Sequence, residues 1–251
     1  MIMQMEAHGI TTQGPHRTVN EDAFCVAPEI GLLAVADGVG GGPAGELASH
    51  TAIDALLEFL KSPALAAEAG TDLELMSLAA EQCDVRVRQV GAEHPGCNRM
   101  STTLTACLVR STSAFFLHIG DSRAYLVRNG AIEQLTDDHV SGSETLASDP
   151  ADDADAAKPQ RRFLLAALGS LVPSGADVFE CEIAPGDIIF LCSDGLSSFV
   201  SDGEIAEACN LPVPLADRGN ALAELARERG SRDDVTAVVA ALHRPTAEEG
   251  G

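Results

Sequence analysis

Short apolar runs separated by polar breaks recur along the chain and predict β-strands. The run at 32–36 is uninterrupted, which is typical of a strand that is covered on both faces. Asn129-Gly130 stands between two further runs and is a strong signal for a two-residue hairpin, because both residues tolerate positive φ. Strand pairs are also expected around Pro185-Gly186. The predicted strands lie at 24–26, 32–36, 104–109, 114–119, 123–127, 131–135 and 235–242.

Longer segments carry apolar residues at helical spacing. Pro43 suits the start of the first helix, because its missing N–H is not needed in a first turn. Two other helices open with a capping-box pattern, in which Thr71 precedes Glu74 and Ser201 precedes Glu204 by three residues. The predicted helices lie at 43–59, 71–90, 159–168, in a short stretch after residue 201, and at 215–229.

The order of these elements indicates the class of fold. Strands and helices are grouped instead of strictly alternating, and the short breaks between strands favour antiparallel pairing. Long amphipathic helices must then cover the sheet faces, so we expect an α+β layered sandwich. The length of 251 residues fits a single domain or a tightly fused pair. Residues 136–158 are acidic and without periodicity, and we expect a mobile loop or lid there.

Composition narrows the choice of partners and compartment. Sixteen basic and 38 acidic side chains give a net charge of −22, which disfavours nucleic acid and membrane surfaces and suits a protein that gathers cations. The seven cysteines are odd in number and show no CxxC pair, so we interpret them as buried thiols in a reducing compartment. The N-terminal residues do not resemble a signal peptide, and the apolar stretch at 163–172 is far shorter than the roughly 20 residues of a membrane span. We expect a cytoplasmic protein.

Aspartates at the ends of apolar runs are the main candidates for chemistry. Asp37, Asp121 and Asp194 end such runs, and Asp233 precedes one. Each of them alone is most simply a solvated turn residue. As a set, however, they would repel one another unless a cation neutralised them. Ligands with only oxygen donors select hard ions, so the sequence predicts Mg²⁺ or Mn²⁺, with two ions able to share a carboxylate and a water.

Other polar residues near the N-terminus extend this candidate site. Glu21 and Asp22 add two carboxylates just before a predicted strand. Arg17 precedes them, and its planar guanidinium suits phosphate oxygens, although alone it would be taken for a surface residue. Gly38 allows close backbone approach, with its carbonyl as a possible ligand. His118 lies within an apolar run and is interpreted as a core or edge residue. The sequence lacks the GxSxG motif of α/β-hydrolases, the GxxxxGK[ST] phosphate-binding loop and the HExxH motif of zinc proteases.

Eight segments, in order, resemble the metal-dependent protein phosphatases of the protein phosphatase 2C type. They are RTVNED at 17–22, AVADGVGG at 34–41, MSTTL at 100–104, GDSRAYL at 120–126, LTDDH at 135–139, ALG at 167–169, IIFLCSDG at 188–195 and SRDDVT at 231–236. The resemblance covers about residues 5–243. It implies a four-layer sandwich in one catalytic domain over 1–251, in which two central antiparallel sheets are flanked by helices. A flap would lie at about 140–158, and a disordered tail at about 244–251.

The resemblance also implies roles for individual residues. Asp37 would bridge two ions, Asp194 and Asp233 would bind the second, and Asp121 would hold a possible third. Glu21 would act mainly through bound water. Counting the Gly38 carbonyl, the implied metal site comprises Glu21, Asp37, Gly38, Asp121, Asp194 and Asp233. The implied catalytic residues are Arg17, which would bind the substrate phosphate, and Asp22, which would orient or deprotonate the attacking water.

Three positions depart from the pattern of the family. Val39 stands where animal members carry a histidine proposed as general acid, so metal-bound water or another acid such as His139 must protonate the leaving oxygen. Asp234 stands where asparagine is commoner, and its extra charge either tightens metal binding or faces solvent. Leu165 replaces the usual arginine before AlaLeuGly, which together with the short acidic flap leaves substrate specificity open.

The leading hypothesis is therefore a monomeric, cytoplasmic phosphatase that hydrolyses phosphoserine and phosphothreonine in proteins and reverses a Ser/Thr kinase of bacterial type. A pseudophosphatase acting as a binding module would need the fold without the carboxylates, and Asp37, Asp121, Asp194 and Asp233 are all present. A third possibility is a phosphatase with a narrow substrate range that acts on one anti-sigma-type partner. The sequence does not distinguish it from an enzyme with a broad substrate range.

Overall fold

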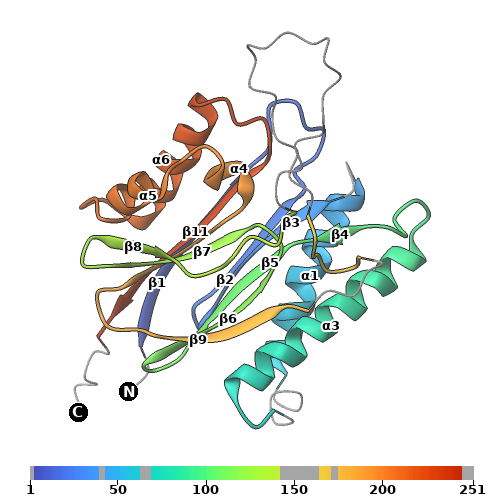
Figure 1. Ribbon diagram of the computed structural model, residues 1–251, viewed down its shortest axis with the longest axis horizontal. Coiled ribbons are helices and arrows are strands. Elements are labelled where there is room, and N and C mark those ends of the chain that lie inside the picture. Colours follow the sequence, from blue (N-terminus) through green and yellow to red (C-terminus); the bar gives the residue numbers. More distant parts are fainter. Residues whose placement is uncertain (1–2, 40–42, 63–68, 142–163, 171–174, 245–251) are drawn as a thin grey trace.

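The computed structural model describes residues 3–39, 43–62, 69–141, 164–170 and 175–244. Its strands form two antiparallel sheets. Helices cover the outer face of each sheet, so the layers follow the order helix, sheet, sheet, helix (Figure 1). This arrangement confirms the expected four-layer α+β sandwich.

The first sheet contains five strands and gathers segments from both ends of the chain. In spatial order its strands are β1 (Gln4–Thr12), β11 (Val235–His243), β10 (Ile188–Cys192), β7 (Arg123–Arg128) and β8 (Ala131–Gln134). The hairpin between β7 and β8 turns at Asn129-Gly130, where both residues have positive φ, as the sequence predicts. β1 and β11 pair along their whole length, from Gln4–His243 to Thr12–Val235.

The second sheet is built from the middle of the chain. Its main path is β2 (Asp22–Ala27), β3 (Leu32–Val39), β5 (Leu104–Val109), β6 (Ser113–Ile119) and β9 (Asp177–Glu182), while the two-residue β4 (Ser101–Thr102) pairs with the end of β3. The uninterrupted apolar run of β3 has a structural reason. Leu33 and Val35 point into the core between the sheets, whereas Leu32, Ala34 and Ala36 point toward the helices.

Helices form the two outer layers. α1 (Pro43–Lys61) and α3 (Asp72–Glu93) cover the second sheet, and α4 (Asp194–Ser197), α5 (Asp202–Cys209) and α6 (Leu215–Glu228) cover the first. The capping box predicted at Ser201 and Glu204 is formed, and the Thr71 hydroxyl accepts a hydrogen bond from the backbone N–H of Glu74.

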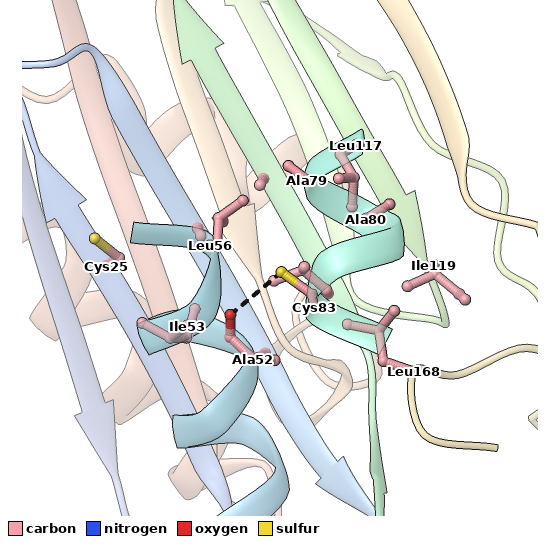
Figure 2. Close-up of a cluster of buried hydrophobic side chains, with 14 of the residues drawn as sticks. Cys25, Ala52, Ile53, Leu56, Ala79, Ala80, Cys83, Leu117, Ile119 and Leu168 are labelled. Carbon is pink, nitrogen blue, oxygen red and sulfur yellow. Dashed lines mark hydrogen bonds between the residues drawn. The ribbon is translucent and has the colours of Figure 1, made fainter. Parts of the chain in front are cut away.

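Small side chains let α1 and α3 pack closely on each other and on the second sheet. Figure 2 shows Ala52 of α1 next to Cys83 of α3, whose thiol donates a hydrogen bond to the Ala52 carbonyl over 3.6 Å. Leu117 and Ile119 of β6 close the same cluster from the sheet side. All seven cysteines are free thiols; five are buried as expected, whereas Cys97 and Cys181 are half-buried.

Four features differ from the elements predicted from sequence. β1 was not predicted, because its residues form no apolar run and Gly9 interrupts it. The short helix α4 was not predicted either. The strands flanking Pro185-Gly186, β9 and β10, exist but belong to different sheets. The fourth concerns the helix predicted at 159–168, which is wrong over its described part. Residues 164–168 are not helical, and Leu164 and Leu168 form isolated β-bridges with Val140 and Thr102.

Other sequence predictions lie largely outside the described residues. These are the glycine cluster at 40–42, most of the flap at 140–158 and most of the tail at 244–251. Among the described helices, none is long and apolar enough to cross a membrane.

Candidate metal centre

The predicted carboxylates lie at one end of the two sheets. Asp22 begins β2 and is paired with Asp37 near the end of β3. Asp194 follows β10, and Asp233 precedes β11, which is the antiparallel neighbour of β10. Asp121 lies in the turn where the chain passes from β6 of the second sheet to β7 of the first. Each aspartate is therefore delivered by a strand end, and both sheets contribute.

The pKa values show that these side chains share one electrostatic environment. Burial raises the pKa of Asp37 well above its ordinary value, and the charges of Asp22, Asp194, Asp233 and Asp121 raise it further. Residues from four other segments of the chain thus act on the Asp37 carboxyl group. The aspartates singled out in the sequence therefore lie close enough to Asp37 for their charges to act on it, while their roles as metal ligands stay a prediction.

Two neighbouring aspartates are perturbed in the same direction. Burial raises the pKa of Asp22 to about 7, although hydrogen bonds from the Thr236 and Ser193 hydroxyls lower it in part. Burial also raises the pKa of Asp194 to about 7, and the charges of Asp121 and Asp233 add to that rise. Near neutral pH, this end of the molecule carries carboxylates whose negative charge is only partly neutralised by nearby positive groups.

Arg17 supplies positive charge at this cluster. Its guanidinium forms an ion pair with Asp233 and a second, at 3.4 Å, with the buried carboxylate of Glu21. Burial lowers the pKa of Arg17, but Asp233 and then Glu21 more than offset this and the pKa is raised. The guanidinium is thus held at the edge of the acidic cluster, next to two of its members.

The backbone around Asp37 is fixed from several directions. The Asp37 N–H donates to the Thr103 hydroxyl over 2.9 Å, and the Asp37 carbonyl accepts from the Thr103 N–H and the Thr102 hydroxyl, also over 2.9 Å. Gly38 follows in close contact with α1, where a Cβ atom would lie only 2.1 Å from the Gly45 carbonyl oxygen. Glycine is required here because the strand end and the start of α1 leave no room for a side chain.

Two buried hydroxyls position Asp22, and sequence reasoning missed both. The Ser193 hydroxyl donates to the Asp22 carboxylate over 2.7 Å and accepts from the Thr236 N–H over 3.0 Å. The Thr236 hydroxyl lies 2.7 Å from that of Thr11. A signal was present in the alternation along the strands, which places Ser193 and Thr236 on the face that looks between the sheets.

The structure also locates the residues at which the sequence departs from the family pattern. Val39 is 41% exposed and Leu165 is 61% exposed, so both face solvent. His139 accepts from the Gly120 N–H at Nδ1 over 3.3 Å, and its Nε2 lies 3.0 Å from the Asp177 carboxylate. Both ring nitrogens of His139 are therefore engaged, one with the backbone of the residue that precedes Asp121 and the other with Asp177.

His118 fits its interpretation as a core residue. It is fully buried and hydrogen-bonded to the Thr105 hydroxyl over 2.9 Å and to the Asp137 carbonyl over 3.0 Å. Burial, reinforced by the nearby His139, lowers the pKa of His118 to about 4, so the ring is neutral at physiological pH.

The donor set fits hard divalent cations. The side chains that raise one another's pKa are all carboxylates, and burial has already removed much of their hydration. Oxygen donors of this kind suit Mg²⁺ and Mn²⁺ better than softer metals. Within the described ranges, no three His, Cys, Asp or Glu side chains already lie at the mutual distances of a metal-ligand set.

The fold and this cluster define a four-layer α+β protein with an acidic centre where strand ends from two sheets meet. The chain belongs to the protein phosphatase 2C family, whose model matches residues 16–240. This result confirms the family that the eight sequence segments indicated.

Similar proteins come from several bacteria. The serine/threonine protein phosphatase PstP of Mycobacterium tuberculosis is 39% identical over 233 residues, and the serine/threonine phosphatase stp of Listeria innocua is 28% identical over 239 residues. The alignment with PstP covers 91% of this chain but 43% of PstP, so the chain spans less than half of that relative. The alignment with stp covers 94% of this chain and 95% of stp. A crystal structure of the mycobacterial phosphatase superposes with a TM-score of 0.80 at 35% identity, covering 97% of this chain and 100% of the other.

Proposed function

We propose that this chain hydrolyses phosphoserine and phosphothreonine in proteins and depends on Mg²⁺ or Mn²⁺. The observation that carries the proposal is the convergence of five aspartates, from strand ends of both sheets, on one electrostatic environment. The similar proteins support the reaction, because PstP and stp are named serine/threonine phosphatases. A structure of the PstP catalytic domain, with a TM-score of 0.80 and 32% identity to this chain, is described as a complex with two manganese ions.

The proposed ligands are Asp37, three of the aspartates whose charges act on it, Glu21 and the backbone beside Asp37. Two bound ions would acidify a shared water and offset the charge of the phosphate. Asp37, at the meeting point of the cluster, is proposed to bridge them, and Asp121 to hold a third ion where one binds. The full proposed set is Glu21 (through water), Asp37, the Gly38 carbonyl, Asp121, Asp194 and Asp233.

Arg17 and Asp22 are proposed to act on substrate and water. The guanidinium of Arg17 has the planar fork that binds two phosphate oxygens, and it lies at the edge of the cluster beside Asp233. Asp22 is held by Ser193 within the cluster, and burial raises its pKa to about 7 in the metal-free protein. We propose that it orients the attacking water and accepts its proton. Because Val39 is apolar and His139 is engaged with Asp177, we propose that the leaving oxygen takes its proton from water.

The enzyme hypothesis is favoured over a pseudophosphatase because the acidic cluster is intact. The described strands all join the two sheets, which supports one catalytic domain. We further propose that the protein acts as a cytoplasmic monomer in signalling and that it reverses a Ser/Thr kinase. The strongly negative charge supports phosphoproteins over nucleic acid or membrane as partners.

Phosphate release from a phosphothreonine peptide and from p-nitrophenyl phosphate tests the proposal. We expect turnover with Mn²⁺, loss of turnover in EDTA and recovery when Mn²⁺ is restored. A circular dichroism spectrum in EDTA serves as the control that the fold persists without metal. Undiminished turnover in EDTA, or none with Mn²⁺ or Mg²⁺ present, would refute the proposal.

A further inference from the structure

Asp234 is a buried carboxylate whose two oxygens each accept a backbone hydrogen bond. Only 1% of the residue is exposed. Its Oδ1 accepts from the Gly14 N–H over 2.7 Å, and its Oδ2 accepts from the Glu21 N–H over 2.7 Å. Both donors are more than 200 positions away in the sequence. Asp234 therefore does not face solvent, which was one of the two alternatives that the sequence left open.

The two amides that Asp234 binds mark the ends of the loop that carries Arg17. Inside the loop, the Arg17 N–H donates to the Gly14 carbonyl over 3.1 Å, and the Gln13 side chain donates to the Arg17 carbonyl over 2.7 Å. These contacts shape the turn locally. The hydrogen bonds to Asp234 instead attach both ends of the loop to the start of β11, because Asp234 immediately precedes that strand.

The same contact links the two sheets at the acidic end. The Glu21 peptide donates its N–H to Asp234, next to the first sheet, and its carbonyl accepts from the Gly38 N–H of β3, in the second sheet, over 3.0 Å. Asp233, the neighbour of Asp234, pairs with the Arg17 side chain. The loop is thus fixed at its ends by Asp234, while its guanidinium is directed toward the cluster by Asp233.

We propose that Asp234 is a positioning residue that holds Arg17 where it binds the substrate phosphate. The inference rests on the proposed function, because it assumes that Arg17 contacts phosphate. A carboxylate suits this task since it offers an acceptor oxygen to each amide. Asparagine has one oxygen, and its NH₂ group would oppose the second N–H, so one end of the loop would lose its partner.

A double-mutant cycle between Asp234→Asn and Arg17→Ala tests the proposal. With a phosphothreonine peptide and saturating Mn²⁺, we expect Asp234→Asn to raise KM by about 10-fold or more and to change kcat by less than about 3-fold. In the Arg17→Ala background, the same change should raise KM no further, because Asp234 acts through Arg17. Asp54→Asn, an exposed change on α1, is the matched control and should leave KM unchanged.

Three results would overturn the proposal. Equal effects of Asp234→Asn in both backgrounds would show a general structural role. Weaker Mn²⁺ binding by calorimetry, with KM unchanged at saturating Mn²⁺, would show that the charge of Asp234 serves the metal. An unaltered KM in the single variant would remove the role altogether. If the wild-type protein itself is inert, the proposed function fails, and with it the role given to Arg17.

Hydrogen exchange provides a second test that needs no variant. In the wild-type protein, the amides of Gly14 and Glu21 should exchange far more slowly than those of His16 and Thr18, for which no such acceptor is present among the described contacts. If Asp234→Asn fails to fold, this test still checks the two hydrogen bonds on which the proposal depends. Exchange of the Gly14 and Glu21 amides as fast as those of the loop interior would overturn the proposal.

Discussion

Asp22 and Asp37 lie directly opposite each other in the β2–β3 ladder, so two carboxylates share one face at the end of the second sheet. Like charges in this arrangement destabilise a sheet. Here Asp194 and Asp233 from the other sheet add to the repulsion that Asp37 experiences. A bound cation or a proton relieves this repulsion.

Asp37→Asn should abolish activity while stabilising the metal-free protein. The change removes the carboxylate at the meeting point of the cluster, so we expect kcat with Mn²⁺ to fall by at least about 10³-fold. In EDTA, Tm should rise because a repelled, buried charge is gone, and the increase in Tm that Mn²⁺ gives the wild-type protein should disappear. Asp54→Asn is the control. Near-wild-type turnover in Asp37→Asn would show that the ligand assignment is wrong.

Stability of the metal-free protein should fall as pH rises. Asp22 and Asp194 have pKa values of about 7 in the folded protein, against an ordinary value of 3.8, so between these values the folded state binds more protons than the unfolded state. The free energy of unfolding in EDTA should therefore be larger at pH 5.5 than at pH 8, as measured by urea denaturation. The net charge of −22 also lowers stability as pH rises. The pH dependence of the wild-type protein is therefore compared with that of Asp194→Asn, which lacks one of the two shifted carboxyl groups. An equally steep pH dependence in that variant would contradict the prediction.

Arg17→Ala should weaken substrate binding, and Arg17→Lys should restore it only in part. Lysine keeps the charge but cannot present two parallel N–H groups to a phosphate. We expect kcat/KM for a phosphothreonine peptide to fall by about 10- to 100-fold in the alanine variant and less in the lysine variant. Arg86→Ala, an exposed change on α3, should have no effect. If lysine is no better than alanine, charge is not what Arg17 contributes.

Gly38→Ala and Gly203→Ala should have opposite consequences for stability. A Cβ atom at Gly38 would lie 2.1 Å from the Gly45 carbonyl oxygen, whereas at Gly203, near the start of α5, nothing lies within 4 Å. We expect Gly38→Ala to cost about 3 kcal/mol or more and to displace Asp37. Gly203→Ala should leave stability unchanged or raise it by up to about 1 kcal/mol, because alanine favours helix. Urea denaturation of both variants measures the difference; similar values would contradict the packing seen at Gly38.

Local patterns were sufficient to predict much of the fold and of the acidic centre. The hairpin at Asn129-Gly130 depends on the φ preferences of two adjacent residues, and the helix after Ser201 depends on a capping box four residues long. Asp37 and Asp194 could be recognised because each ends an apolar run, and the need to neutralise several such carboxylates suggested a shared cation. These signals lie within a few residues of one another, so the sequence alone carries them.

The tertiary structure decided the features that depend on partners distant in the chain. β1 is a strand because it pairs with β11, more than 220 residues away. Residues 164–168 are not helical, and Leu168 instead forms a β-bridge with Thr102. Ser193 positions a carboxylate because its hydroxyl donates to Asp22. Asp234 fixes the ends of a loop because it accepts from the Gly14 and Glu21 amides. In each case the conformation or the role depends on hydrogen bonds to residues distant in the chain, and these bonds exist only in the folded protein.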